Sequence, residues 1–104
     1  MKTSIETTIT KGGGSVFADL GFSPVEARNL QLRSRMMTAL RSFIEKEKLT
    51  QVEAARRLRV SQPRISDLTR GQISRFSLDT LVNMLSDAGL EVDFRIKPPS
   101  RRVA

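Results

Sequence analysis

The sequence predicts a mainly α-helical domain, all-α apart from one strand near its C-terminus. Serine or threonine stands directly before several apolar patterns that repeat every three or four residues, which is typical of capped amphipathic helices. The period shortens to two only over residues 90–96, which is typical of a strand. A chain of 104 residues corresponds to one domain with a modest core. The predicted fold is therefore a small helical bundle with a C-terminal strand.

The positive charge is concentrated in the middle of the chain. The net charge is +7, and residues 28–49 and 50–76 each hold six Lys or Arg against two Asp or Glu. The two end segments nearly balance. Such localisation indicates an anionic partner, nucleic acid before others, although a basic surface kept only for solubility has the same composition.

Composition excludes several classes of function. The chain has no cysteine and no histidine, so disulfides, Cys/His zinc sites, thiol nucleophiles and imidazole bases are ruled out. Because paired-carboxylate and metal-ligand spacings are also missing, we expect no enzyme, no catalytic or metal site and no cofactor. No apolar run approaches the ~18 residues of a membrane span. We therefore expect no membrane partner and a cytoplasmic location.

Residues 1–22 are expected to form a flexible N-terminal segment. Three glycines at positions 12–14 lack the lysine that a phosphate-binding loop requires after them, so they are interpreted as a hinge. Residues Ser4–Thr10 carry a weak alternating pattern that favours a short strand.

The first helix is expected from about Pro24 to Glu47. Ser23 is a suitable N-cap, and Glu26 completes a capping box with it. We expect its apolar stripe to belong to the core, although a basic amphipathic helix can also bind membranes or peptide grooves. The stripe consists of Leu32, Met36, Leu40, Phe43 and Ile44.

Two short helices are expected next. Thr50 begins another capping box before a helix over Gln51–Arg59, and Ser61 can cap a helix over Gln62–Arg70. At about 100° per residue, Ile65 and Leu68 share one side of the second helix. The opposite side carries Pro63, Ser66, Asp67 and Arg70. Two short helices joined in this way form a helix-turn-helix unit, whose second helix fits the major groove of duplex DNA.

A last helix and a strand complete the expected fold. Ser77 can cap a helix that ends near Ala88, with Leu78, Leu81, Val82 and Leu85 on its buried face. The following strand, Leu90–Ile96, would leave its edges open if it stood alone. We expect it to pair with its copy in a second subunit or with Ser4–Thr10 of the same chain. The expected domain therefore spans residues 23–89, followed by a strand at 90–97 and a basic tail at 98–104.

The run "LTQVEAARRLRVSQPRISDLTRG" resembles the helix-turn-helix of lambdoid phage repressors, Cro and the xenobiotic-response-element regulators. Together with "FSLDTLVNML" and "GLEVDFRI", it makes residues 17–96 similar to small antitoxins of the HigA type. This resemblance implies a lambda-repressor-like bundle and a homodimeric repressor that binds a palindromic operator in double-stranded DNA. It also implies that the protein autoregulates its operon and neutralises a RelE/HigB-like mRNA endonuclease. Stand-alone and phage-type regulators share the same core, so a regulator without a toxin partner is the alternative.

The resemblance also implies which residues contact DNA. Gln51 matches a helix-start glutamine that contacts a phosphate, and Gln62 matches a first recognition-helix residue whose amide can pair with adenine. Asp67 can accept from a cytosine amino group, or can simply pair with a neighbouring arginine. The predicted DNA-binding set is Gln51, Ser61, Gln62, Pro63, Arg64, Ser66, Asp67, Arg70 and Arg75. The predicted dimerisation set is Leu90, Val92, Phe94 and Ile96.

Two features of the chain qualify this resemblance. Arg59 stands where the family often has a turn glycine, and arginine bears a steric cost there if the turn needs a positive φ. The N-terminal segment carries apolar residues that can order on a toxin, namely Ile5, Ile9, Val16, Phe17, Leu20 and Phe22. Alternatively, residues 17–22 pack against the first helix of the same chain.

Overall fold

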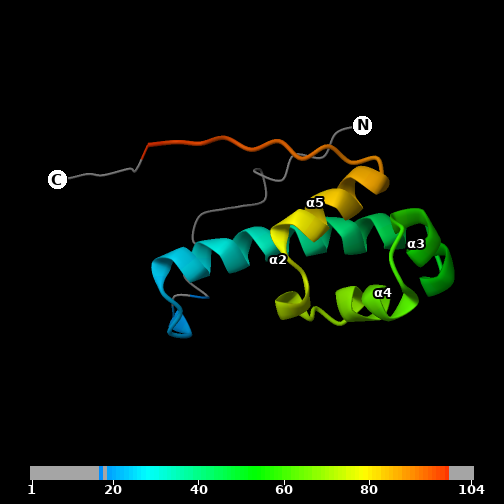
Figure 1. Cartoon of the computed structure of the whole chain (residues 1–104), viewed down its shortest axis with the longest axis horizontal. Helices are drawn as coiled ribbons and strands as arrows, with labels where there is room; N and C mark the ends of the chain where they lie inside the picture. The colour runs from blue at the N-terminus through cyan, green and yellow to red at the C-terminus, as the bar shows by residue number, and fades with distance from the viewer. Residues whose placement is uncertain (1–16, 18, 99–104) are drawn as a thin grey trace.

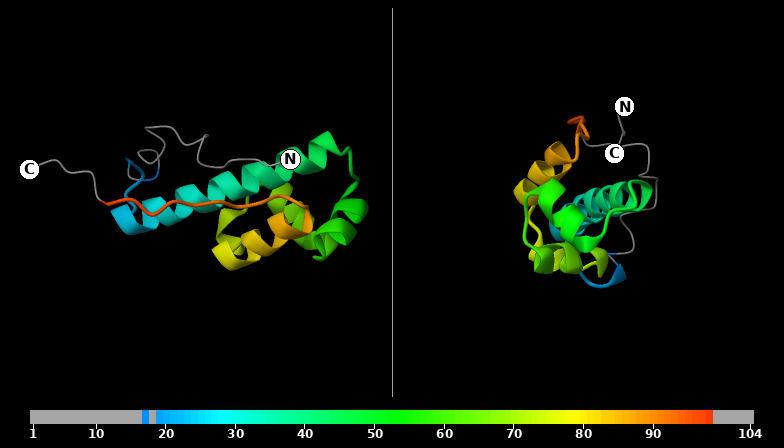
Figure 2. Two further views of the ribbon diagram at one scale, coloured as in Figure 1. Left: turned by 90° about the horizontal axis from the view of Figure 1, so that it is seen from above. Right: turned by 90° about the vertical axis from the view of Figure 1, so that its right-hand side faces the viewer.

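One long helix, α2 (Pro24–Lys46), supports shorter helices that pack along it (Figure 1). They are α3 (Gln51–Leu58), α4 (Gln62–Thr69), the 3-10 turn η2 (Ile73–Arg75) and α5 (Leu78–Asp87). This computed structural model describes residues 17 and 19–98 of the chain. α3 lies at the C-terminal end of α2, and α4 and α5 pack on different sides of α2 (Figures 1 and 2). The mainly helical fold class is therefore confirmed.

Side-chain caps fix where the helices begin. Ser23 Oγ accepts from the backbone N–H of Glu26 at 3.2 Å, and Glu26 Oε1 accepts from the N–H of Ser23 at 3.1 Å. Thr50 and Glu53 form the same reciprocal box, at 3.1 and 2.9 Å. α4 and α5 each begin after a serine that caps one N–H group. These caps satisfy N–H groups that have no partner within the helix, and they confirm the predicted helix starts.

The core lies where α2, α3, α4 and α5 meet. Two residues predicted to be buried are not: Leu32 is 38% exposed and Val82 is 39% exposed. Each lies roughly 90–100° around its helix from the centre of the buried face, so it falls at the edge of that face. Met37, which was not predicted, takes part instead. The buried cluster is Met36, Met37, Leu40, Ala54, Leu58, Ile65, Leu68, Phe76, Leu81, Met84, Leu85 and Ala88.

The predicted strand over Leu90–Ile96 is not present as a strand. Residues 90–98 run as a single extended segment, which passes along α2 beyond the end of α5 (Figures 1 and 2). Leu90 and Val92 pack against the core, but Phe94 and Ile96 are 80% and 87% exposed. A strand is defined by a ladder of backbone pairing with a neighbour, and residues 90–98 do not belong to such a ladder.

Several sequence predictions lie outside the described residues. They are the weak strand Ser4–Thr10, the glycine hinge at positions 12–14 and most of the basic tail after Pro98. The possible pairing of Leu90–Ile96 with Ser4–Thr10 therefore stays a prediction.

Candidate nucleic-acid interface

The α3–turn–α4 unit is held together by a small apolar contact surface. Ala54 and Leu58 of α3 are 0% and 1% exposed, and Ile65 and Leu68 of α4 are both 0% exposed. The prediction that these two α4 aliphatics face inward is therefore confirmed. The other side of this eight-residue helix begins with two exposed residues, Gln62 and Pro63.

The turn between the two helices depends on a left-handed arginine. Arg59 has φ 57° and ψ 44°, directly after the end of α3. The N–H of Val60 donates to the carbonyl of Ala55 at 3.0 Å, and the N–H of Arg59 donates to that of Arg56 at 3.3 Å. This is the C-terminal pattern that usually contains glycine. The turn therefore keeps the geometry expected of the family, and Arg59 carries the steric cost.

The outward side of α4 begins with Gln62 and Pro63, both exposed. Ser61, directly before them, caps the helix by accepting from the N–H of Arg64 at 3.3 Å. Pro63 costs little there, because first-turn N–H groups have no partner within the helix. Ser66 lies one turn further on and is half-buried. The outward side of α4 is therefore a narrow polar surface, of a size that fits the major groove of duplex DNA.

Arg64 does not extend outward as predicted for a DNA-contacting residue. Its Nη1 donates to the carbonyl of Arg75 at 2.6 Å, and its guanidinium lies 5.3 Å from the ring centroid of Phe76. Because Phe76 is 1% exposed, this cation–π contact anchors Arg64 against the core. Arg64 therefore links α4 to the last residue of η2.

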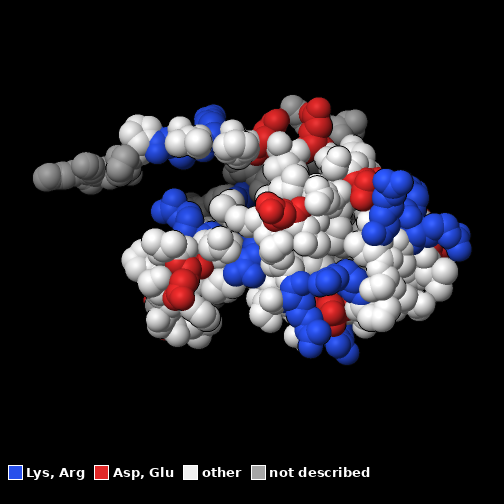
Figure 3. All heavy atoms as spheres, viewed as in Figure 1, with Lys and Arg blue, Asp and Glu red and all other residues white. Residues whose placement is uncertain are grey.

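Asp67, Arg70 and Arg75 form a charged cluster on the outward side. Arg70 Nη2 lies 3.6 Å from Asp67 Oδ1, and Arg75 Nη1 lies 3.9 Å from Asp67 Oδ2. In Figure 3 the acidic group over α4 and η2 is enclosed by basic ones, and a second basic group covers α3. The sequence alternative in which Asp67 pairs with a neighbouring arginine is therefore confirmed for Arg70.

Two arginines of α2, not predicted as site residues, position this interface. Arg33 Nη1 donates to the carbonyls of Ile73 and Phe76 at 3.2 and 3.1 Å. Arg41 Nη1 donates to the carbonyl of Leu68 at 3.3 Å, near the C-terminal end of α4. Arg33 and Arg41 thereby link α2 to the backbone around η2 and to the backbone near the end of α4. Arg33 lies near the middle of the buried face of α2, but the sequence does not show which carbonyls it meets.

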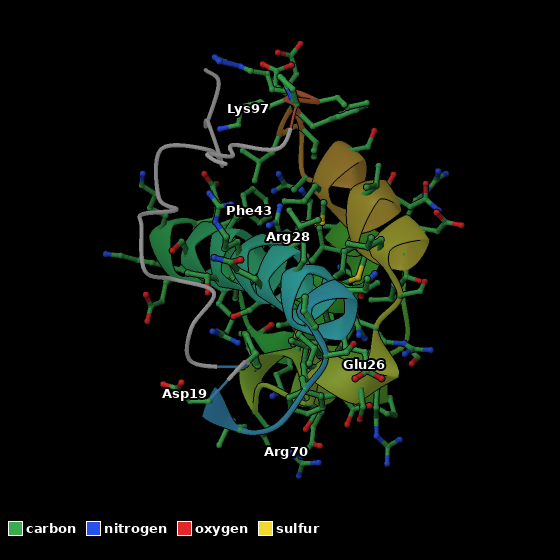
Figure 4. All side chains as sticks on the ribbon, turned by 90° about the vertical axis from the view of Figure 1, so that its left-hand side faces the viewer. Asp19, Glu26, Arg28, Phe43, Arg70 and Lys97 are labelled. Atoms are coloured by element: carbon green, nitrogen blue, oxygen red, sulfur yellow. The ribbon has the colours of Figure 1, made fainter. Side chains whose placement is uncertain are left out.

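The predicted dimerisation residues lie apart from the interface. Figure 4 shows Arg70 of α4 and Lys97 of the C-terminal segment on opposite sides of the molecule, with α2 between them. The structure therefore does not bring the predicted DNA-binding and dimerisation residues together.

The described part of the chain carries no grouping that would indicate a metal site or a membrane span. Among residues 17 and 19–98, no three Asp or Glu side chains gather where they could hold an ion. No helix in that part of the chain has the length and apolarity needed to cross a bilayer.

A helix-turn-helix with an outward second helix and a basic surround defines a DNA-binding protein of the helix-turn-helix class. A family model described as a helix-turn-helix domain matches residues 16–97, so the chain belongs to that family. Membership of this family indicates the general function of the protein, which is a DNA-binding regulator. No curated protein shows a significant match to the chain.

Proposed function

We propose that the protein is a cytoplasmic, sequence-specific repressor that places α4 in the major groove of duplex DNA and performs no catalysis. The observation that carries this proposal is the complete burial of Ile65 and Leu68. It turns Gln62, Pro63 and Ser66 outward on a helix narrow enough for the groove. The local basic excess supplies sequence-independent attraction to the phosphates.

The proposed contacts fall into two groups. Gln62, exposed in the first turn of α4, offers an amide that can pair with an adenine edge in two hydrogen bonds. Gln51 is the first residue of α3, where its side chain and the unpaired N–H groups of the helix start suit a phosphate. Arg70 and Arg75 are the proposed phosphate contacts beside the groove, and the 63% and 62% exposure of their side chains supports this role. Base contacts would give specificity, and phosphate contacts would give affinity.

Selection from a random pool of duplexes tests this proposal. We expect the protein to enrich a palindromic sequence, whose affinity then exceeds that of a scrambled duplex and falls steeply with salt. Gln62→Ala should relax the preference at one base pair by about 1–3 kcal/mol. Gln31→Ala, on α2 and outside the α3–α4 unit, is the matched control. A pool that stays unenriched, with equal affinity for all duplexes, would remove the proposal.

We infer further that Leu90–Ile96 pairs with the same segment of a second copy to form a homodimer. Phe94 and Ile96 are apolar and are 80% and 87% exposed on an extended segment, so a second copy of that segment could bury them. One helix-turn-helix makes few contacts, and a two-fold dimer on a palindrome doubles them.

Sedimentation over a range of concentrations tests the dimer. Phe94→Pro removes both an N–H donor and an apolar side chain, so we expect it to sediment as a monomer. Lys97→Pro, at the end of the segment, should leave the dimer intact. Wild-type protein that stays monomeric throughout would contradict the inference and would favour pairing with Ser4–Thr10.

A second candidate function is that of an antitoxin. Leu20, Phe22 and Val25, at the N-terminal end of α2, are 69%, 42% and 79% exposed. Phe22 and Val25 also line an open hollow of about 300 Å³, together with Leu30 and Arg33. Exposed apolar groups around a hollow favour a protein partner. We propose a RelE/HigB-like mRNA endonuclease, with a stand-alone regulator as the alternative.

Co-expression with the product of the adjoining reading frame tests the antitoxin role. If that product is such an endonuclease, the protein should relieve its growth arrest and co-purify with it. Val25→Asp should abolish both effects, whereas Val82→Asp, on α5 and 39% exposed, should abolish neither. An adjoining product that neither arrests growth nor binds would leave the stand-alone regulator.

A further inference from the structure

Asp67 is the one acidic residue between the start of α4 and Arg75, on the surface where DNA is proposed to bind. Its side chain is 16% exposed, whereas its partners Arg70 and Arg75 are 63% and 62% exposed. The two arginines therefore lie beside the carboxylate and are far more open to solvent than it is. A carboxylate in this position faces two groups of phosphates if α4 enters a groove, and it repels both.

The fold fixes the position of the cluster of Asp67, Arg70 and Arg75, because other side chains bind the backbone of and around Arg75. Two contacts hold the side chain of Arg64 in place: its guanidinium lies over buried Phe76 and donates to the carbonyl of Arg75 at 2.6 Å. Arg33 of α2 holds the carbonyls of Ile73 and Phe76 on either side of Arg75. The backbone of Arg75 is therefore fixed from two directions beside Asp67, and only its side chain is left to exchange partners.

The two ion pairs are arranged to open. At 3.6 and 3.9 Å they are longer than a charge-assisted hydrogen bond, and both arginines are largely in solvent. Exposed pairs of this kind are weak and screened by salt. A phosphate brought close by the groove can therefore replace Asp67 as the partner of either arginine, and the carboxylate is then left without its cations.

We propose that Asp67 determines specificity by acting as an internal counter-ion for Arg70 and Arg75. On an arbitrary duplex it competes with phosphates for both arginines and weakens binding. On the preferred duplex the released carboxylate accepts from a base amino group, cytosine N4 or adenine N6, in the major groove. Guanine O6 and N7 and thymine O4 are acceptors, so they repel it. This inference rests on the proposed DNA-binding function of α4.

The salt dependence of binding gives the expected size of the effect. Each phosphate neutralised by a protein cation contributes about 0.9 to the slope of log affinity against log salt. Removing Asp67 releases up to two arginines, so the slope on scrambled duplex should steepen by about one to two. The affinity for scrambled duplex at about 0.1 M salt should rise by about tenfold.

The test compares Asp67→Ala with Asp87→Ala on scrambled and pool-selected duplexes at two salt concentrations. Both variants remove one negative charge, but Asp87 ends α5, away from α4. We expect Asp67→Ala to gain on scrambled duplex as above and much less on selected duplex, so that discrimination falls about tenfold. Asp67→Asn, of the same size, should also gain on scrambled duplex, because the lost charge is the cause. Far-UV circular dichroism checks that the variants keep the fold.

Three other outcomes separate the possible failures. If Asp67→Ala gains no more than Asp87→Ala on scrambled duplex, the counter-ion role is overturned. If it gains equally on both duplexes, the role in specificity is overturned. Both results can occur while wild-type protein still enriches a sequence from the pool. Failure of that enrichment is the separate result that overturns the proposed repressor function and, with it, this inference.

Discussion

The α3–α4 unit and the C-terminal segment differ in how far they bury their apolar side chains. Ile65 and Leu68 are fully buried, whereas Phe94 and Ile96 are 80% and 87% exposed. A helix satisfies its backbone hydrogen bonds internally and needs only one apolar surface against it, which α3 and α2 provide. An extended segment needs a second segment for its hydrogen bonds as well. Burial of the α4 aliphatics is achieved within the described part of the chain, whereas Phe94 and Ile96 stay exposed and favour an apolar partner.

The largest expected effect comes from truncating one apolar side chain in each region. Leu68→Ala should lower the free energy of unfolding by about 3 kcal/mol, because it leaves a cavity in a closed core. Ile96→Ala should change it by less than about 0.5 kcal/mol at protein concentrations where the chain is monomeric. Urea unfolding followed by circular dichroism measures both. A large effect of Ile96→Ala under those conditions would mean that the segment is buried within one chain.

The same difference explains how much of the fold could be predicted. Helix starts depend on residues three apart, such as Ser23 and Glu26 or Thr50 and Glu53, so the sequence predicted them to the residue. The inward side of α4 depends on its own period and was also predicted. Whether residues 90–96 form a strand depends on whether they pair with Ser4–Thr10 or with a second copy, and their alternating pattern does not decide between the two.

The side-chain contacts of the candidate interface were predicted less completely than the helices that carry them. Gln62 and Pro63 are outward as predicted, but Arg64 turns inward onto Phe76. The resemblance implied that Arg64 contacts DNA, but the ring that Arg64 meets in the structure, Phe76, lies in a later segment. Arg33 and Arg41 were missed for the same reason, since their acceptor carbonyls lie 27 to 43 residues further along the chain. Long side chains that reach distant backbone are not visible in local spacing.

The next largest expected effect concerns the hydrogen bonds from Arg33 of α2 to the distant backbone around η2. Arg33→Met keeps much of the side-chain length but removes the guanidinium that donates to the carbonyls of Ile73 and Phe76. We expect a loss of about 1–2 kcal/mol in unfolding free energy, in line with hydrogen bonds to a charged donor. Arg28→Met, at an exposed position of the same helix, is the matched control and should be near neutral. Equal effects would mean that the two hydrogen bonds contribute nothing measurable.

A smaller effect tests the local determinants of the helix-turn-helix. Thr50→Ala removes the oxygen that accepts from the N–H of Glu53 at 3.1 Å, and we expect a loss of about 1 kcal/mol. Ser42→Ala, within α2 and exposed, lacks this capping role and should be neutral or slightly stabilising. Thermal unfolding of the two variants measures the difference. A neutral Thr50→Ala would show that packing alone sets the start of α3.

The smallest expected effect concerns the turn and has the opposite sign. Arg59 holds the same left-handed position after α3 that Gly71, at φ +72°, holds after α4. A residue with a Cβ in the left-handed conformation lowers the stability of the folded state by about 1–2 kcal/mol. Replacing it with glycine removes this strain, but the greater freedom of glycine in the unfolded chain offsets about half of the gain. Arg59→Gly should therefore raise the unfolding free energy by about 0.5–1 kcal/mol. Arg56→Gly, inside α3, should lower it by about 1 kcal/mol.

If Arg59→Gly is stabilising yet weakens binding to scrambled duplex, then Arg59 trades folding stability for phosphate attraction beside the proposed interface. A destabilising Arg59→Gly would instead mean that the arginine side chain makes contacts that outweigh its backbone strain. In that case the turn would depend on tertiary contacts, as the position of Arg75 does, and the contrast between a locally determined α3–α4 unit and a partner-dependent C-terminal segment would narrow.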